Sequence, residues 1–439
     1  MSLVSSLPAQ AVDFRFSYGG GTSLEQMLQF EIAGGIWASY LTDDVQLNIY
    51  VEATSALPDY VIGGALPGID DGEKYADLLE NLELDSSSEY DKIAHATLND
   101  VSAKEFDIGF NGNNKDAEIQ GLKKLNLTRA NAKALGLRKA DDDDLDGLIL
   151  MNDLSDSIYD WFYGAEGALT DNQLDFTTVA LHELGHTLGF FSGMDDPGFL
   201  AMALKKQSEQ KEIKEGDMKY ISFLDLFRYS ETSALAGRPD MSLTEENAYF
   251  SLDAGKTNLG SLSAGVGVDG FQASHWKESD DTLGIMGPLL RPGVQERISI
   301  LDKIAFDVTG WDVDYGAEID LALLERQAKA RLAERLSQVL ETEITVEWLE
   351  THPKLAAALL VEDRSKDAEK LIKESKRYDR RRSSRTGFSQ ETWQTVFAQE
   401  AYFSKVDGPN TTESVPEPGT LLGLLGLGLA GLGHKFSRR

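Results

Sequence analysis

The chain contains no cysteine among its 439 residues. Disulfide bonds, cysteine-based zinc sites and a cysteine nucleophile are therefore all excluded. This absence does not fix the cellular compartment, because an exported protein with a large enough core can fold without disulfides. At this length the chain has ample material for a packed core, and it is expected to form two or three domains.

Basic residues are few relative to acidic ones. Lysine and arginine total 42 against 73 aspartates and glutamates, and the formal net charge at pH 7 is −31. Such a chain repels phosphate groups, so nucleic-acid binding through general electrostatics is excluded. The ordinary interpretation of this acidity is a solvated surface, which could also attract cations.

The N-terminal segment lacks features of a complete secretory signal. Ala9-Gln10-Ala11 resembles the small-residue cleavage site of such a signal. No lysine or arginine precedes it, however, and its apolar run is poor. We interpret residues 1–11 as a truncated signal peptide whose true start lies upstream; the alternative is that they are no signal peptide.

The C-terminal segment has three parts. Val415-Pro416-Glu417-Pro418 precedes an apolar stretch at 421–433, and basic residues close the chain at 434–439. The apolar stretch is shorter than the roughly 20 residues that a stable spanning helix needs, and its basic end would favour the cytoplasmic side. An ordinary short anchor is one interpretation of this pattern.

The same three parts, in this order, resemble the PEP-CTERM sorting signal of bacterial exported proteins. The resemblance implies that an exosortase-type machinery recognises and removes the tail, with transient membrane contact through 421–433. It further implies an exported protein that reaches the cell surface or the extracellular space after processing.

The chain between its two ends predicts a mixture of strands and helices. Polar–apolar alternation or short apolar runs predict strands, and apolar residues at helical spacing predict helices. The expected strands lie at 46–51, 106–110 and 148–151. The expected helices lie at 24–40, 87–98, 170–191 (capped by Thr170-Asp171-Asn172), 202–214 and 300–311 (ending at Gly310), with a helical pattern from 318 to about 404. No internal repeat is present.

Histidine is scarce, with six in the chain, yet two of them stand four residues apart at His182 and His186. Glu183 follows the first, which completes a His-Glu-x-x-His pattern that so few histidines would rarely produce by chance. On a helix both imidazoles lie on one face, one turn apart, and can reach one zinc ion. A zinc-activated water could then attack a carbonyl, with Glu183 as the general base. A hydrogen-bonded histidine pair on a buried helix is the alternative.

A catalytic zinc site needs a third protein ligand. Gly189 can turn the chain sharply after the helix, but Ser192, where many metzincins carry the third ligand, is a poor zinc ligand. His275 stands in Ala273-Ser-His-Trp-Lys277, eleven residues before Met286. Asp195 or Asp196 is the alternative third ligand. The remaining histidines lie in less suitable places: His95 in an expected helix, His352 in the helical region and His434 in the tail.

Residues 182–190 and 274–288 together resemble the leishmanolysin-type metzincins, and segments at 225–230 and 301–311 are similar to bacterial metalloproteases with this sorting tail. The resemblance implies that His182, His186 and His275 bind one zinc ion, that Glu183 is the catalytic base and that Met286 is the Met-turn residue. There are two departures. The disulfides typical of leishmanolysins are absent, and Pro288 stands where a tyrosine could have acted as an extra ligand.

The fold class expected from this resemblance is α+β. A metzincin-like catalytic domain would combine a mixed sheet and an active-site helix with a lower Met-turn subdomain, and a helical region would follow. The expected domains are a signal peptide at 1–11, a zinc metallopeptidase domain at 12–315, a helical region at 316–404, a linker at 405–414 and a sorting signal at 415–439.

An acidic loop gives a second, weaker metal signal. Asp142, Asp144, Asp146 and Gly147 match the first half of an EF-hand loop, and Asp153 stands at its twelfth position. The segment 148–151 fits a strand equally well, so an acidic solvated loop is the ordinary interpretation and calcium binding the alternative.

The sequence therefore favours an exported zinc-dependent metalloendopeptidase acting on a protein or peptide substrate, with one zinc ion per chain. Three alternatives stay open. They are a surface or matrix binding protein that keeps the scaffold without turnover, a structural calcium-binding module, and an aminopeptidase or other zinc hydrolase.

Overall fold

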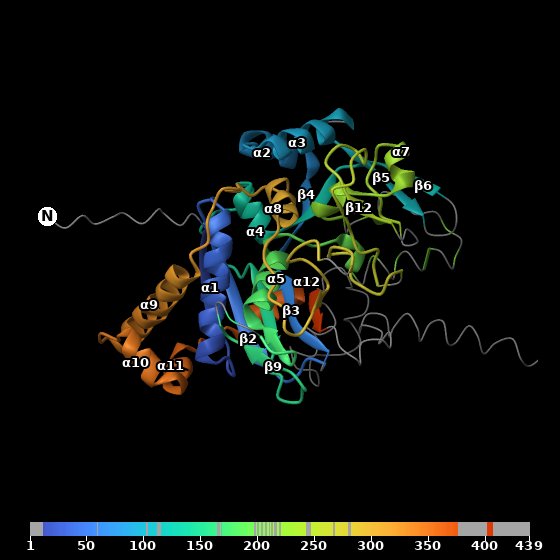
Figure 1. Cartoon of the computed structure of the whole chain (residues 1–439). Coiled ribbons are helices and arrows are strands. Elements are labelled where there is room, and N and C mark those ends of the chain that lie inside the picture. The colour runs from blue at the N-terminus through green and yellow to red at the C-terminus, as the bar shows by residue number, and fades with distance from the viewer. Residues whose placement is uncertain are drawn as a thin grey trace, which may run out of the picture.

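The computed structural model describes residues 12–375 and 402–406, apart from gaps at 59, 102–103, 112–115, 165–166, 168, 243–246, 267 and 280–281 and several positions between 197 and 220. Within this part of the chain a mixed sheet and two long helices form the centre (Figure 1). The N-terminal segment 1–11 and the sorting tail at 415–439 lie outside the described residues. Within the described part, none of the helices combines the length and hydrophobicity needed to cross a bilayer.

The central sheet has six strands in the order β1-β2-β8-β3-β15-β14. They are β1 (Val12–Tyr18), β2 (Val45–Thr54), β8 (Gly147–Asn152), β3 (Val61–Pro67), β15 (Tyr402–Val406) and β14 (Leu289–Leu290). The first three are parallel, whereas β3 is antiparallel to β8 and β15 is antiparallel to β3. The sheet is thus mixed, as expected for the α+β class.

Both faces of the sheet are covered. Strand side chains alternate between the faces, so Ile149 and Met151 of β8 enter the main core, whereas Leu148 and Leu150 pack in a smaller cluster with α12 (Ser365–Ser375). On the main-core side the sheet carries α1 (Leu24–Tyr40) and α5 (Phe176–Leu188). This two-sided burial explains the continuous apolar run of β8.

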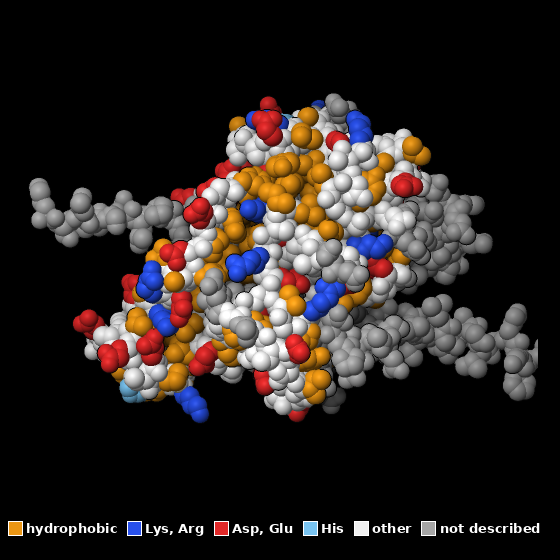
Figure 2. Space-filling model, viewed as in Figure 1, with side chains coloured by type: hydrophobic (Ala, Val, Ile, Leu, Met, Phe, Trp, Pro, Cys, Tyr) orange, Lys and Arg blue, Asp and Glu red, His pale blue; other side chains and the backbone are white. Residues whose placement is uncertain are grey.

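Helix α1 begins with a capping box, in which the Ser23 side chain accepts the amide N–H of Gln26 and the Gln26 side chain accepts that of Ser23. Most of its residues are buried, because α1 lies between α5 and α9 (Leu321–Leu340). The C-terminal helices α10 (Val346–Thr351) and α11 (Pro353–Leu360) pack beside α9. Acidic and basic side chains mix over this outer group of helices on the face shown in Figure 2.

The remaining elements are short. Around α2 (Tyr75–Asp85) and α3 (Glu89–Val101) lie two antiparallel pairs, β4 (Ile69–Lys74) with β7 (Lys124–Thr128) and β5 (Phe106–Asn111) with β6 (Asp116–Leu122). A parallel pair, β9 (Asp160–Phe162) and β10 (Gln173–Asp175), precedes α5. The others are α4 (Arg129–Ala134), η1 (Gly193–Asp195), η3 (Leu224–Phe227), β11 (Arg228–Tyr229), α7 (Glu231–Leu235), β12 (Tyr249–Phe250), β13 (Gly260–Ser261) and α8 (Ile300–Asp307).

Most of the elements expected from the sequence are confirmed. The helix at 24–40 and the strands at 46–51, 106–110 and 148–151 are present, and the helix expected at 87–98 corresponds to α3. The helix expected at 202–214 falls largely outside the described residues.

Three of the expected boundaries were wrong. The helix expected from residue 170 begins at Phe176, because 173–175 pair as a strand and the Asp175 side chain caps the helix. Helix α8 ends at Asp307, three residues before Gly310. The helical pattern expected to about 404 holds to 375 as separate helices, but Tyr402–Val406 is a strand of the central sheet. Part of the expected linker therefore belongs to this strand.

A buried ion pair anchors α4 to the start of β8. The Lys133 Nζ lies 2.7 Å from the Asp146 Oδ2, and both side chains are inaccessible to solvent. Lys133 also donates to the backbone carbonyl of Gln46 at 2.8 Å. Burial raises the pKa of Asp146 to about 6 even though the Lys133 charge opposes this rise.

We expect Lys133→Ala to lower the free energy of unfolding by about 3–5 kcal/mol, because it leaves the Asp146 carboxylate buried without its cation. Lys139→Ala is the matched control, since Lys139 pairs with Asp141 on the exposed surface and such pairs contribute about 0–1 kcal/mol. Denaturant unfolding of both variants measures the difference. Equal losses would contradict the assigned role of the buried pair.

Candidate functional site

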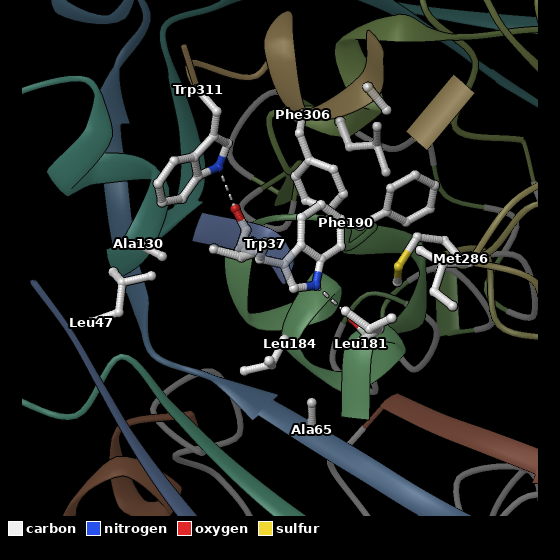
Figure 3. Packing of buried hydrophobic residues seen from close by; sticks show 14 of the residues in the cluster. Trp37, Leu47, Ala65, Ala130, Leu181, Leu184, Phe190, Met286, Phe306 and Trp311 are labelled. Carbon is white, nitrogen blue, oxygen red and sulfur yellow. Dashed lines mark hydrogen bonds between the residues drawn. The ribbon is translucent and has the colours of Figure 1, made fainter. Parts of the chain in front are cut away.

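Helix α5 carries the His-Glu-x-x-His pattern through the centre of the molecule. His182, Glu183 and His186 are 3%, 0% and 0% exposed. Two indoles hold this helix, as Figure 3 shows. The Trp37 Nε1 donates to the carbonyl of Leu181 at 3.0 Å, and the Trp311 Nε1 donates to that of Leu188 at 2.9 Å. The second bond satisfies a carbonyl of the last helical turn, which has no partner within the helix.

Three imidazoles converge at this helix. The His182 Nε2 lies 3.0 Å from the His186 Nε2 and 3.3 Å from the His275 Nε2. His275 is 1% exposed and comes from a segment 89 residues after His186. Among the described residues, these three histidines form one of two groups whose side-chain ligand atoms all lie within 4.8 Å of one another. The structure therefore brings together the three histidines singled out from the sequence.

The second nitrogen of each ring faces a backbone carbonyl. The Nδ1 atoms of His182, His186 and His275 lie 2.8, 2.7 and 3.1 Å from the carbonyl oxygens of Ile285, Phe190 and Gln272. A carbonyl only accepts, so each Nδ1 carries the proton and each Nε2 keeps its lone pair. Carbonyl partners of this kind fix the tautomer and the ring orientation of metal-binding histidines.

The environment also keeps these rings neutral. Burial lowers the pKa of His182 to about 4. Burial is the main cause that lowers the pKa of His186 well below its usual value. The repulsion that protonated His182 and His275 would exert on a protonated His186 lowers it further. Three neutral rings with their lone pairs directed at one another form a donor set that suits a cation.

Met286 lies against α5 on the side of the histidines. It is completely buried, and a side-chain Cβ at Gly185 would collide with its sulfur. The position of the sulfur beside the helix is visible in Figure 3. The turn that carries Met286 also supplies the Ile285 carbonyl to His182. The turn therefore orients the His182 imidazole, and Met286 fills the space beside the helix.

Two aspartates fix the approach to His275, of which Asp225 is buried and Asp195 is partly buried. The Asp195 side chain accepts the amide N–H groups of Ala273 at 2.7 Å and Ser274 at 2.8 Å, and also the Ser274 hydroxyl. The Asp225 side chain accepts the Ser192 hydroxyl at 2.6 Å and the Gly193 amide at 2.8 Å. Asp195 and Asp196 are not part of the three-histidine group. Asp195 holds the segment that carries His275. Ser192 anchors the start of the chain segment that runs from Gly189 to His275.

Asp302 connects three parts of the site. Its carboxylate accepts the Trp276 Nε1–H at 2.7 Å, the Ile285 amide at 2.8 Å and the Ser299 amide at 2.7 Å. These bonds join the residue after His275, the methionine turn and the start of α8. Burial raises the pKa of Asp302, while these hydrogen bonds lower it. Asp225 and Asp302 were not identified as site residues from the sequence, whereas Asp195, considered there as an alternative third ligand, instead holds the segment before His275.

Glu183 lies where α5 crosses β3. A Cβ at Gly63 would come within 2.9 Å of the Glu183 Oε1 and 2.8 Å of a Val179 methyl. Only glycine therefore allows the strand to pass this close to the carboxylate. Glu183 thus follows one of the clustered histidines on α5, and its carboxylate lies beside the backbone of β3.

The other residues considered from the sequence lie elsewhere. His95 is on α3 beside Asn99, and His352 stacks on Trp348; His434 is outside the described residues. The candidate calcium ligands Asp142, Asp144, Asp146 and Asp153 do not converge as a metal group among the described residues. Asp142 and Asp144 pair with Arg138, Asp146 pairs with Lys133 and Asp153 accepts from Ser155. Calcium binding at this loop stays a prediction.

The second group of side chains whose ligand atoms lie close enough to hold a metal ion is acidic. It was not predicted from the sequence. It consists of Asp43, Asp85 and Asp312, which come from three separate segments. Burial and the repulsion of the other two carboxylates raise the pKa of Asp43 to about 8. The pKa of Asp85 is raised to about 7, mainly by burial and then by the repulsion of neighbouring carboxylates, of which Asp312 contributes most. A pattern spread over three segments gives no local signal.

We expect this group to make the protein less stable as the pH rises. The folded-state pKa of Asp43 exceeds its ordinary value of 3.8, so between about pH 4 and 8 the folded chain binds a proton that the unfolded chain has released. Asp43→Asn should therefore raise the free energy of unfolding by more than about 1 kcal/mol at pH 8 and change it little at pH 4. Denaturant unfolding in a chelating buffer measures both. A stabilisation independent of pH would contradict the assigned pKa.

Comparison with known proteins identifies the tail. The PEP-CTERM protein-sorting motif matches residues 414–439, which confirms the interpretation of this segment. Such a motif indicates recognition by an exosortase, together with export and sorting to the cell surface or the extracellular space. No curated protein and no solved structure matches the chain.

Proposed function

We propose that the protein is an exported zinc-dependent metalloendopeptidase, with a catalytic domain of the metzincin type. One observation carries the proposal: the buried imidazoles of His182, His186 and His275 bring their Nε2 atoms together, and Glu183 follows His182 on the same helix. The sorting motif supports the exported location.

The donor set fits zinc. Zinc in catalytic sites takes three protein ligands with zinc–nitrogen distances of about 2.0–2.1 Å, which corresponds to roughly 3.3 Å between ligand atoms in a tetrahedron. The Nε2 separations of 3.0 and 3.3 Å from His182 to its two neighbours are close to this value. With the proton on each Nδ1, no hydrogen bond can form between the Nε2 atoms. A bound cation would supply the attraction that holds these nitrogens close together.

His182, His186 and His275 would hold the ion, which when bound supplies a Lewis acid that polarises a carbonyl and acidifies water. Glu183 neighbours His182 in the sequence, and its carboxylate lies at the β3 side of α5. It would accept the proton of the attacking water and return it to the departing amine. Met286, Asp195 and Asp302 hold the ligands in place and are not catalytic residues.

A binding protein that keeps this scaffold without turnover is the second candidate. The presence of Glu183 beside the three histidines favours the enzyme, because a structural zinc site requires no base next to an open position. The two candidates differ in peptide hydrolysis, and zinc content alone does not separate them.

We expect one zinc ion per chain in the wild-type protein and measurable cleavage of casein. Glu183→Ala should keep the zinc and lose at least about 10²-fold in kcat, because a general base contributes about 10²–10⁴-fold. His275→Ala should lose the zinc, whereas the control His95→Ala should retain both zinc and activity. Metal analysis and a casein assay measure these outcomes.

Absence of zinc from the wild-type protein after incubation with the ion would refute the site. Zinc retained without cleavage of any peptide substrate would favour the binding protein. Full activity in Glu183→Ala would contradict the role of Glu183 as the general base.

We expect Asp195→Ala to weaken zinc affinity by about 10–100-fold, as removal of residues that orient metal ligands commonly does. The change releases the amides of Ala273 and Ser274 and loosens His275. Asp196→Ala is the matched control, because Asp196 accepts instead from Phe199. Competition with a chromogenic chelator measures the affinity, and equal affinities in the two variants would contradict the positioning role.

A further inference from the structure

Strand β15, from the C-terminal part of the chain, lies in the central sheet between β3 and β14. Strand β15 pairs antiparallel with β3 on one side and parallel with β14 on the other. Strand β3 passes beside Glu183, and β14 begins three residues after Met286. Helix α5 itself contacts β15. The strand thus crosses the site between the base and the methionine turn.

The register places the middle of this strand at the base. Ser404 pairs with Gly63, the residue whose Cβ would touch the Glu183 carboxylate. The pairing then shifts between Ser404 and Lys405, which pairs with Val61. The main chain at this irregularity therefore lies opposite Glu183.

Without β15, the outer edge of β3 and the facing edge of β14 would both present unpaired main-chain groups. Such edges bind extended peptides through main-chain hydrogen bonds, by addition of a strand. Because β15 is an internal segment with chain continuing on both sides, the groove admits a polypeptide that has no free end there. This geometry suits internal cleavage and fits an aminopeptidase poorly.

We propose that residues 402–406 occupy the peptide-binding groove of the zinc site and compete with substrate for it. The inference rests on the proposed peptidase function, and it identifies the occupant as a segment of the same chain. A tethered segment of this kind competes at an effective concentration of up to about millimolar. The sorting motif begins at residue 414, so the occupying strand is separated from it by 407–413.

The test uses the full chain with the double substitution Phe403→Pro/Ser404→Pro. Successive amides of a strand point to opposite neighbours, so one of the two prolines removes a donor that faces β3. The other lies on the side of β14, whose pairing with this strand is at Lys405 and Val406. Thr411→Pro/Thr412→Pro is the matched control, with two prolines placed outside residues 402–406. Folding of all variants is compared by circular dichroism.

Hydrogen exchange tests occupancy without any need for activity. It is measured on zinc-loaded full-length chains that carry Glu183→Ala, so that the segment cannot be consumed. We expect the Lys405 and Val406 amides and those of β3 to be protected in the parent and in the control, and to exchange faster with the Phe403→Pro/Ser404→Pro pair. Equal exchange in the three chains would overturn the inference, whatever the activity of the enzyme.

Cleavage of a quenched fluorescent peptide tests competition in the chains that keep Glu183. If the groove is open about a tenth of the time, release of the segment lowers the KM about tenfold without changing kcat. Equal KM values for the parent and the double variant would overturn competition. A protection difference with no cleavage by any chain would support occupancy and refute the proposed peptidase function, so the two failures are distinguishable.

Discussion

The packing of three neutral imidazoles is the constraint on which the rest of the site depends. The Nε2 lone pairs of His182, His186 and His275 face one another at about 3 Å, an arrangement that is unfavourable without a cation among them. Two of these rings are fixed by the geometry of one helix. The third comes from 89 residues further along the chain, and hydrogen bonds from Ala273 and Ser274 to Asp195 hold the segment that carries it.

Three carboxylates do this placing, of which Asp225 and Asp302 are buried and Asp195 is partly buried. Asp195, Asp225 and Asp302 each accept two or more hydrogen bonds from backbone amides and nearby side chains of the insertion, the methionine turn and α8. Hydrogen bonds to a charged acceptor contribute about 1.5–3 kcal/mol each, which helps to offset the cost of burying the carboxylate. A carboxylate bonded to two chain segments holds their separation fixed. The placement of the three imidazoles therefore depends on residues outside the histidine cluster.

The sequence was informative where the signal is local. Spacing alone placed His182 and His186 on one helical face, with Glu183 next to the first, and the apolar run at 148–151 correctly predicted a strand. His275 required the resemblance to a known family, because no local pattern links it to α5. Asp195 was considered only as an alternative ligand, and the supporting role of Asp195, Asp225 and Asp302 could not be predicted among 73 acidic residues, since it arises from contacts with distant backbone amides. The trio of Asp43, Asp85 and Asp312 was missed for the same reason.

The strand at 402–406 shows why composition was misleading near the C-terminus. The preceding chain is rich in helix-forming residues and is helical to 375, but the state of 402–406 is decided by the edge it meets. An uncovered edge beside Glu183 would pair with any extended chain. A segment of the same molecule shields that edge, and its main-chain pairing spans only five residues. In the proposed peptidase, shielding and peptide recognition use the same hydrogen-bonding groups, so the strength of one limits the other.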